Sequence, residues 1–392
     1  MLDVEGLPDM QRAIAAAGAD GWLLYDFRKS NPIAAALMRL EGLASRRVFA
    51  WVPAQGTPVA ITHAIEQGEW VHWPASWERR VYASWRSFES EVASLVAGKR
   101  VLMEYSPGDA VPVVDRVPAG VVEMVRAAGA TVMTSADLIS RFFAAWTPAQ
   151  LASHRRAAEV IARIAREAFT RAGKAVRAGE SMHEHELNDW IRDEFGKAGL
   201  FTDHGPNVSA SENAANPHYE PGAEHPRRLR MGDTILIDLW ATEPGGIYAD
   251  QTWMGCIGEP SPTLRDVWVV VRDARDAAID LIRARLRAGQ SPSGADADDA
   301  ARGVIDAAGY GPYFTHRTGH SIDERALHGS GPNLDNLETR EERVLIPGVG
   351  FSIEPGIYLP GEIGVRSEVN AFVGDDGLVI TPEVYQTELF VV

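Results

Sequence analysis

The sequence predicts an α+β protein in which a smaller α/β domain precedes a larger domain. Three observations support this prediction. The chain has 392 residues, which is enough for two or three domains. Short apolar runs alternate with helical patterns in residues 1–143, as they do in α/β domains. Residues 144–392 instead keep hairpin strands and long helices in separate stretches, as α+β domains do.

The first domain is predicted to alternate strands and helices along residues 1–143. Its strands are expected at residues 22–25, 48–52, 59–61 and 101–103, and its helices near residues 10–17, 33–43 and 88–96. We place the domain boundary between residues 143 and 144. Just after it, Thr147 and Pro148 have the residue types that favour a helix N-cap and a first helical position.

The second domain, residues 144–392, is predicted to contain four helices and two pairs of strands. The helices are expected from residue 148 to about 172, after a capping box Ser181-x-x-Glu184, and at residues 263–286 and 295–308. Residues 234–240 and 248–253 flank a Pro-Gly-Gly loop and are expected to form a hairpin. Residues 350–354 and 364–369 are expected to form a second strand pair, followed by turns and short strands over residues 371–392.

Composition excludes several classes of protein. The chain is 45% hydrophobic and 23% charged, which argues against intrinsic disorder. Its 38 basic and 54 acidic side chains give a formal net charge of −16, which argues against a nucleic-acid or anionic membrane surface as partner. Cys256 is the only cysteine, so no intrachain disulfide and no thiolate metal cluster can form. With no signal peptide and no transmembrane run recognisable, we expect a cytoplasmic protein.

Several common catalytic motifs are missing. Residues 329–333 lack the third glycine of a dinucleotide loop, no P-loop string occurs, and residues 319–323 lack the final glycine of a nucleophile elbow. The string His183-Glu184-His185-Glu186 resembles a zinc motif, but its histidines are spaced i, i+2, whereas a helical zinc site needs i, i+4. We interpret this string as a solvated helix face.

Four acidic residues stand inside apolar strand sequence. They are Asp238, Asp250, Glu354 and Glu368. An ionised carboxylate in a buried strand is costly unless it is paired or binds a metal, and four of them together need a shared cationic partner. His320, which lies between Asp250 and Glu354 in the sequence, can supply a nitrogen ligand. The count exceeds the three protein ligands of a usual catalytic zinc and fits two metal ions with bridging carboxylates.

These strings resemble the pita-bread metallopeptidase family, which contains methionine aminopeptidases, Xaa-Pro aminopeptidases and Xaa-Pro dipeptidases (prolidases). The order Asp238, Asp250, His320, Glu354, Glu368 is the ligand order of that family, and the similarity covers about residues 148–392. Residues 354–358 and 364–366 are typical of its proline-directed branch. The resemblance implies a pita-bread catalytic domain over residues 144–392, preceded by a creatinase-like α/β domain over residues 1–143.

The resemblance also implies roles for single residues. Asp238 would bind one metal, His320 and Glu354 the other, and Asp250 and Glu368 would bridge the two. Glu354, His218 and His328 are the expected catalytic residues: the proton acceptor, the histidine beside the leaving nitrogen and the oxyanion contact. His218, His316, His328 and Arg366 are the expected substrate-binding residues. Arg366 would bind the free carboxylate of proline or brace the metal carboxylates, and Arg317 and Arg325 are further candidates for the carboxylate contact.

Two departures from the family pattern stand out. Gln251-Thr252-Trp253 follows Asp250 where the family usually has an Arg-containing string, so support for this strand must come from elsewhere. The stretch between His320 and His328 is unlike the common glycine-rich form and is one residue longer. We therefore expect the shape of the substrate pocket to deviate from that of the family.

The function expected from the resemblance is hydrolysis of Xaa-Pro dipeptides by a homodimer with two divalent metal ions per chain. Mn²⁺ is the expected metal, with Co²⁺ or Zn²⁺ as alternatives, since carboxylate and imidazole ligands suit all three. An Xaa-Pro aminopeptidase acting on longer peptides is the alternative function. A metal-free hydrolase resembling creatinase and a non-catalytic binding module are less compatible with five retained ligands. The residue preferred before proline stays open.

Overall fold

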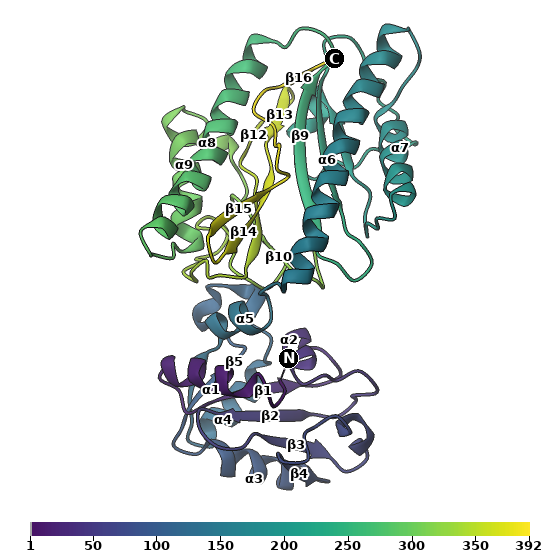
Figure 1. The fold of residues 1–392 in the computed structure, drawn as a ribbon. Coiled ribbons are helices and arrows are strands. Elements are labelled where there is room, and N and C mark those ends of the chain that lie inside the picture. Colours follow the sequence, from purple (N-terminus) through teal and green to yellow (C-terminus); the bar gives the residue numbers. More distant parts are fainter. Residues whose placement is uncertain (1) are drawn as a thin grey trace. The chain divides into compact units, whose positions relative to one another are not determined.

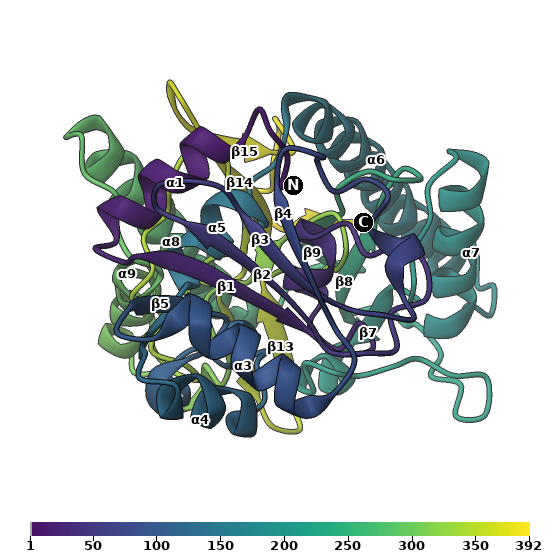
Figure 2. The same ribbon diagram turned by 90° about the horizontal axis from the view of Figure 1, so that it is seen from below.

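The computed structural model describes residues 2–392, and the chain divides into two compact units, Met1–Phe143 and Ala144–Val392. Figure 1 shows the ribbon of the chain, and Figure 2 shows the same ribbon from below. Within residues 2–392, no helix has both the length and the hydrophobicity that crossing a membrane requires. The mixed α and β content agrees with the predicted fold class.

The first unit is built on a six-stranded sheet with the order β4-β3-β2-β1-β5-β6. Its strands are β1 (Gly21–Asp26), β2 (Val48–Pro53), β3 (Val59–His63), β4 (Glu78–Tyr82), β5 (Arg100–Met103) and β6 (Thr131–Thr134). The four predicted strands correspond to β1, β2, β3 and β5. The two edge strands, β4 and β6, were not predicted, because their mostly exposed side chains lack an apolar strand pattern.

Helices cover both faces of this sheet. They are α1 (Leu7–Ala16), α2 (Pro32–Leu37), α3 (Trp85–Val96), α4 (Ala119–Ala127) and α5 (Ala136–Phe142), with short 3₁₀ helices η1 (Gln67–Trp70), η2 (Pro107–Asp109) and η3 (Pro112–Val114). Along β1, Trp22 and Leu24 belong to the core shared with α1, α2 and α5, whereas Leu23 and Tyr25 belong to the core shared with α3 and α4. The helix predicted at residues 33–43 is shorter than expected, because the backbone is left-handed at Arg39 (φ 57°).

The second unit contains four long helices. They are α6 (Pro148–Arg177), α7 (Glu184–Lys197), α8 (Pro262–Arg287) and α9 (Gly294–Ala307), with 3₁₀ helices η4 (Ser211–Ala215) and η5 (Gly311–Tyr313). Thr147 caps α6 by accepting a hydrogen bond from the backbone N–H of Gln150, as predicted. The capping box Ser181-x-x-Glu184 is wrong. Glu184 is the first residue of α7, and it is Glu186 whose carboxylate accepts a hydrogen bond from the N–H of His183.

The strands of this unit form two four-stranded sheets and a hairpin. One sheet has the order β16-β9-β8-β7, with β7 (Asn207–Ala210), β8 (Thr234–Ala241), β9 (Ala249–Cys256) and β16 (Phe390–Val391). The other has the order β10-β11-β14-β15, with β10 (Ser321–Ile322), β11 (Gly350–Ile353), β14 (Val369–Gly374) and β15 (Gly377–Thr381). Strands β12 (Gly356–Leu359) and β13 (Ile363–Arg366) pair only with each other. The predicted β8–β9 hairpin is confirmed.

The predicted pairing of residues 350–354 with residues 364–369 is wrong. Strand β11 pairs with β14, and β13 pairs with β12. Pro355 has no backbone N–H and so cannot continue a ladder. The chain therefore leaves β11 at Glu354, forms the β12–β13 hairpin and returns as β14.

Two pairs of helices enclose these strands. Figure 1 shows α6 and α7 on one side of the strands and α8 and α9 on the other. Apolar residues of α6 and α7 share a core with β7, β8 and β9, and apolar residues of α8 and α9 share a second core with the β11–β14 sheet and the β12–β13 hairpin. The strands that carry the candidate site residues therefore lie between two packed layers.

Candidate metal centre

Two aspartates share one face of the β8–β9 hairpin. In its antiparallel register Asp238 lies opposite Thr252, and Asp250 lies opposite Trp240. The two aspartates are therefore diagonal neighbours, and diagonal side chains of an antiparallel pair are within reach of one another. The backbone N–H of Asp250 donates to Oδ1 of Asn370 on β14, at 2.8 Å, which connects the hairpin to the second sheet.

Two glutamates lie at the adjoining ends of β11 and β14. Ile353 on β11 pairs with Val369 on β14, so Glu354, just after β11, and Glu368, just before β14, flank the same pair. The hydroxyl of Ser352 donates to Oε1 of Glu354 at 2.9 Å. The hydroxyl of Thr252 donates to Oε2 of Glu368 at 2.8 Å, which connects Glu368 to the β8–β9 hairpin.

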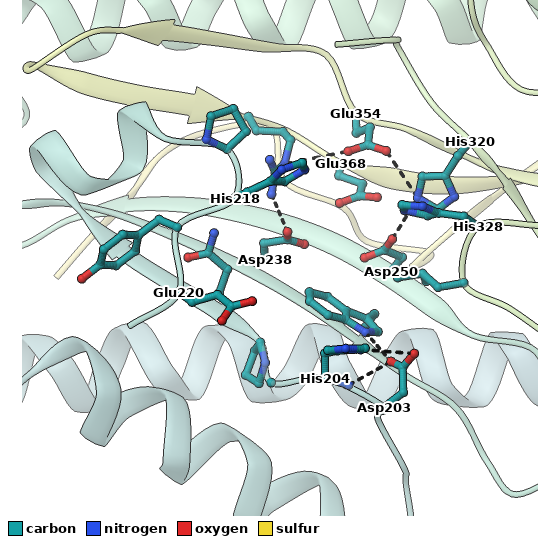
Figure 3. Close-up of a pocket in the computed structure, with 18 of the residues that line it drawn as sticks. Asp203, His204, His218, Glu220, Asp238, Asp250, His320, His328, Glu354 and Glu368 are labelled. Carbon is teal, nitrogen blue, oxygen red and sulfur yellow. Dashed lines mark hydrogen bonds and ion pairs between the residues drawn. The ribbon is translucent and has the colours of Figure 1, made fainter. Parts of the chain in front are cut away.

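His320 lies between these carboxylates. Its Nε2 is 3.3 Å from Oδ2 of Asp250 and 3.4 Å from Oε1 of Glu354 (Figure 3). Its Nδ1 donates to the carbonyl of Ser321 at 3.0 Å, so the proton of a neutral ring is on Nδ1. Burial lowers the pKa of His320, which favours the neutral ring. The lone pair of Nε2 therefore faces two carboxylate oxygens, an arrangement that a cation between them would stabilise.

Burial and mutual repulsion also shift the pKa values of the four carboxylates. Burial raises the pKa of Asp238 to about 7, against the opposing effect of Arg366, and burial with the charge of Glu354 raises the pKa of Asp250 to about 8. Burial and the neighbouring carboxylates raise the pKa of Glu368 well above its usual value. Burial acts in the same direction on Glu354, but His320 and other neighbouring basic groups outweigh it and lower its pKa.

Among residues 2–392, one buried carboxylate oxygen has no hydrogen-bond partner. Oε1 of Glu368 is buried and makes no hydrogen bond within residues 2–392. Ligand atoms of Asp250, His320 and Glu368 all lie within 4.8 Å of one another. An orphaned carboxylate oxygen, a lone pair facing carboxylates and raised pKa values all fit divalent cations, which remove the repulsion among such ligands. Oxygen and imidazole donors are the ligands that Mn²⁺, Co²⁺ and Zn²⁺ accept.

Arg366 is fully engaged with the protein. Its guanidinium donates to Oδ2 of Asp238 through Nη2, to the hydroxyl of Tyr358 through Nη1 and to the hydroxyl of Thr252 through Nε. The side chain is only 5% exposed. Of the two roles considered for Arg366, this geometry matches bracing of the metal carboxylates. Arg317 and Arg325 also line the pocket and stand as candidates for contact with a substrate carboxylate.

The three predicted substrate histidines differ in whether their rings are hydrogen-bonded within the protein. The rings of His218 and His328 lie in exposed positions of the pocket lining and make no hydrogen bond among the described residues. The neighbouring His320 ring, 4.2 Å away between centroids, lowers the pKa of His328 to about 4. Both ring nitrogens of His316 are hydrogen-bonded within the protein: Nδ1 donates to the carbonyl of Arg317, and Nε2 accepts from the hydroxyl of Tyr358.

The five motif residues, the three predicted substrate histidines and Arg366 all line one cavity of about 1200 Å³. The sequence analysis missed other lining residues, among them Asp203, His204, Tyr219, Trp240 and Tyr248. Trp240 could have been found, because it is two residues after Asp238 on β8 and so shares its face. Its indole N–H donates to Oδ1 of Asp203 at 3.0 Å, and Figure 3 shows Asp203 and His204 apart from Glu354 and Glu368. No local pattern in the sequence identifies Asp203.

A sequence profile of Metallopeptidase family M24 matches residues 154–375, which is more than half of the chain. The chain belongs to metallopeptidase family M24. The pita-bread resemblance inferred from the five motif strings is thereby confirmed, and all five motif residues lie inside the matched range. Membership implies divalent metal ions, in agreement with the donor set described above.

Curated relatives match about half of the chain. "Probable dipeptidase PepE" of Mycobacterium tuberculosis is 36% identical over 172 residues, which are 44% of this chain and 42% of that protein. "Xaa-Pro dipeptidase" of Lactobacillus delbrueckii subsp. lactis is 34% identical over 207 residues, 53% of this chain and 50% of that protein. The chain thus spans about half the length of these relatives. Dipeptidase PepE from Mycobacterium ulcerans has the same fold, with a TM-score of 0.74, 24% identity and coverage of 99% and 97%.

The structure shows how this M24 chain compensates for its unusual string after Asp250. Gln251 donates from Nε2 to the carbonyl of Ala158 on α6 at 2.9 Å, and its Oε1 accepts from the indole of Trp253 at 2.9 Å. Both side chains are buried. Together with the contact between Asp250 and Asn370, they hold the ligand strand from both sides.

The unusual stretch between His320 and His328 has an organising residue of its own. Asp323 accepts hydrogen bonds from the N–H groups of Arg325 (2.8 Å) and Ala326 (3.0 Å) through Oδ1 and of Ser330 (3.0 Å) through Oδ2. Asp323 is buried, at 4% exposure. It therefore closes the loop that presents His328 to the cavity.

Proposed function

We propose that this chain is a metallopeptidase that hydrolyses Xaa-Pro dipeptides. The observation that carries the proposal is the convergence of four carboxylates and His320 on one cavity that also contains His218 and His328. Relatives named "Probable dipeptidase PepE" and "Xaa-Pro dipeptidase" support the substrate class.

We propose that two divalent ions would be held by Asp238, Asp250, His320, Glu354 and Glu368, and that Asp250 and Glu368 would contribute to both. Two divalent ions in such a site supply Lewis acidity and lower the pKa of a coordinated water toward about 7. The protein holds the ligands in place through its own hydrogen bonds. Thr252 joins Glu368 to Arg366, and Arg366 joins Asp238 to Tyr358.

The remaining steps belong to side chains of this chain. Glu354 would accept the proton of the attacking water, because its carboxylate faces the centre of the site and is ionised, since neighbouring basic groups lower its pKa. His328 lies beside His320 and is available to donate to the developing oxyanion. His218 lies in the cavity wall, and its ring makes no hydrogen bond with residues 2–392. It would therefore be available to assist departure of the proline nitrogen, which must gain a proton to leave as an amine.

An Xaa-Pro aminopeptidase is the second candidate function. The cavity of about 1200 Å³ is larger than the ~300–1,000 Å³ typical of small-ligand sites. It therefore has room for residues beyond proline. The same catalytic residues would serve both activities, and the difference would lie in the carboxylate contact.

We further propose Mn²⁺ as the native metal, a homodimer as the working form and the cytoplasm as its location. Hard oxygen and imidazole ligands favour Mn²⁺ chemistry over a thiolate zinc site. The single cysteine, Cys256, is buried and suits a reducing compartment. The family resemblance supports the dimer.

A substrate panel tests the proposal. The purified protein is assayed with Mn²⁺, Co²⁺ or Zn²⁺ on Xaa-Pro dipeptides, Xaa-Pro-Yaa tripeptides and matched Xaa-Ala dipeptides. We expect Xaa-Pro dipeptides to be cleaved fastest. Tripeptides cleaved at an equal or higher rate would replace the dipeptidase with the aminopeptidase, and indifference to proline would refute both.

A further inference from the structure

Glu184 is a buried carboxylate that the proposed mechanism does not use. Its residue is only 1% exposed, although the sequence string around it is charged and resembles a solvated helix face. Ionisable side chains are rarely buried to this extent without partners. Burial raises the pKa of Glu184, against the opposing effect of its hydrogen-bond donors. The interpretation of residues 183–186 as a solvated face is therefore wrong at Glu184.

The partners of Glu184 all come from one later segment. Oε1 accepts from the backbone N–H of Ala210 at 2.5 Å, at the end of β7. The side-chain amide of Asn213 donates to both carboxylate oxygens, at 3.2 and 3.0 Å. The hydroxyl of Tyr219 donates to Oε2 at 2.6 Å. One carboxylate at the start of α7 thus fastens residues 210–219 at three points.

His218 lies at the far end of this segment. The ring of His218 makes no hydrogen bond with residues 2–392, so its position depends on the backbone that carries it. Within residues 216–220 the other hydrogen bonds are local: Asn216 to Asn213, His218 to Asn216 and Tyr219 to Asn216. Apart from the bond of Asn216 to Asn213 in the adjoining η4, the bond from Tyr219 to Glu184 is the one hydrogen bond among the described residues that ties residues 216–220 to a helix or sheet.

We propose that Glu184 is a positioning residue for His218, acting through the hydroxyl of Tyr219. The carboxylate fixes Tyr219 to α7, and the neighbouring residue His218 is thereby held in one orientation toward the cavity. The kinetic part of this inference rests on the proposed Xaa-Pro activity. The structural part, the attachment of residues 213–219 to α7, does not.

Tyr219→Phe is the cleanest probe, because it removes one hydroxyl and leaves the other bonds of Glu184 in place. We expect kcat for an Xaa-Pro dipeptide to fall about 10- to 100-fold, since a small misplacement of a catalytic group has effects of that size. KM should change less than kcat, because the proposed role of His218 in the departure of the proline nitrogen acts mainly on the chemical step. In the His218→Ala background, Tyr219→Phe should change kcat less than about twofold, because its effect passes through His218.

Substitutions of Glu184 provide the graded series. Glu184→Gln keeps an oxygen for the N–H of Ala210 and offers an amide N–H to the Tyr219 oxygen. Most of the wild-type kcat should therefore be retained. Glu184→Ala removes every acceptor and should lower kcat at least as much as Tyr219→Phe. Glu186→Gln, on the same helix but exposed, is the matched control and should behave as the wild type.

Amide hydrogen exchange of the intact protein gives a readout that needs no substrate. In Tyr219→Phe, the amides of residues 213–219 should exchange faster than in the wild type, while those of β8 and β9 stay unchanged. Unchanged exchange in residues 213–219 would overturn the tether. An equal loss of kcat from Tyr219→Phe with and without His218 would overturn its action through that histidine. A wild-type protein without Xaa-Pro activity would refute the proposed function and leave the exchange result to decide the tether.

Discussion

Nε2 of His320 lies 3.3 Å from Oδ2 of Asp250. The Nδ1 proton is used on the carbonyl of Ser321, so a neutral His320 presents a lone pair to a carboxylate. These two electron-rich atoms need a shared cation: a proton, which the raised pKa of Asp250 retains in the metal-free protein, or a divalent metal ion that would replace it. This relationship underlies the interpretation of the site as a metal centre.

Substitution of Arg366 separates bracing from substrate binding. Because its guanidinium is bonded to Asp238, Thr252 and Tyr358, Arg366→Ala should weaken metal binding about 10- to 100-fold, as loss of an outer contact to a ligand does. It should lower kcat/KM for Xaa-Pro and Xaa-Pro-Yaa by the same factor. Steady-state kinetics and metal titration measure both. A rise in KM confined to the dipeptide would show instead that Arg366 holds the proline carboxylate.

Asp323 is predicted to control the loop that carries His328. Asp323→Ala removes the acceptor for three backbone N–H groups, and the loosened loop should lower kcat/KM about 10-fold. Asp323→Asn retains one carbonyl oxygen and should lose less. Bound metal, measured by elemental analysis, should stay at the wild-type level in both. Metal loss equal to the activity loss would mean that the loop supports His320 rather than His328.

Glu104 should make the first unit sensitive to pH. It is fully buried, accepts hydrogen bonds from the indole of Trp22 and the amide of Asn31, and burial raises its pKa to about 7. A carboxyl with a raised folded-state pKa favours the folded state fully below its unfolded pKa, and this contribution is lost as pH rises toward 7. Between pH ~4.5 and ~7, the wild type should lose roughly 3 kcal/mol relative to Glu104→Gln.

Denaturant unfolding of wild type and Glu104→Gln across this pH range measures the difference directly. Above about pH 8 the difference between the two proteins should become constant, because Glu104 is then ionised in both states. Parallel stability curves from pH ~4.5 to ~7 would show that Glu104 does not titrate in this window.

Removal of metal should destabilise the protein more at high pH than at low pH. In the metal-free protein the pKa values of Asp238 and Asp250 are raised to about 7 and about 8. Their protonated forms stabilise the metal-free fold below the unfolded pKa, and that stability is lost as pH rises through 7 to 8. Calorimetry with and without chelator should show a gap in Tm that widens from about pH 5.5 to about pH 8.5. A gap independent of pH would argue against these ligands.

The sequence was most informative where chemistry is local. Asp238, Asp250, Glu354 and Glu368 are conspicuous because an acidic residue in apolar strand sequence is rare. Thr147 and Pro148 are informative for a similar reason, since a helix N-terminus is specified by the few residues that form it. These features depend on no distant part of the chain.

The sequence was least informative where partners are distant. The pairing of β11 with β14 depends on a return of the chain after the β12–β13 hairpin, and local patterning does not show which strand is the neighbour. Glu184 looks like a surface residue because its three donors lie 26 to 35 residues later in the chain. The role of Arg366 is similarly set by Asp238, Thr252 and Tyr358, which only the fold brings together.

A metal titration of the chelator-treated protein tests the central claim most directly. Hydrolysis of an Xaa-Pro dipeptide is followed while Mn²⁺ is added to wild type and to His320→Ala. The wild type should be inactive without metal and reach full activity as two Mn²⁺ per chain bind, while His320→Ala should stay at background although it remains folded. Full activity in the metal-free wild type, or wild-type activity in His320→Ala, would contradict the account.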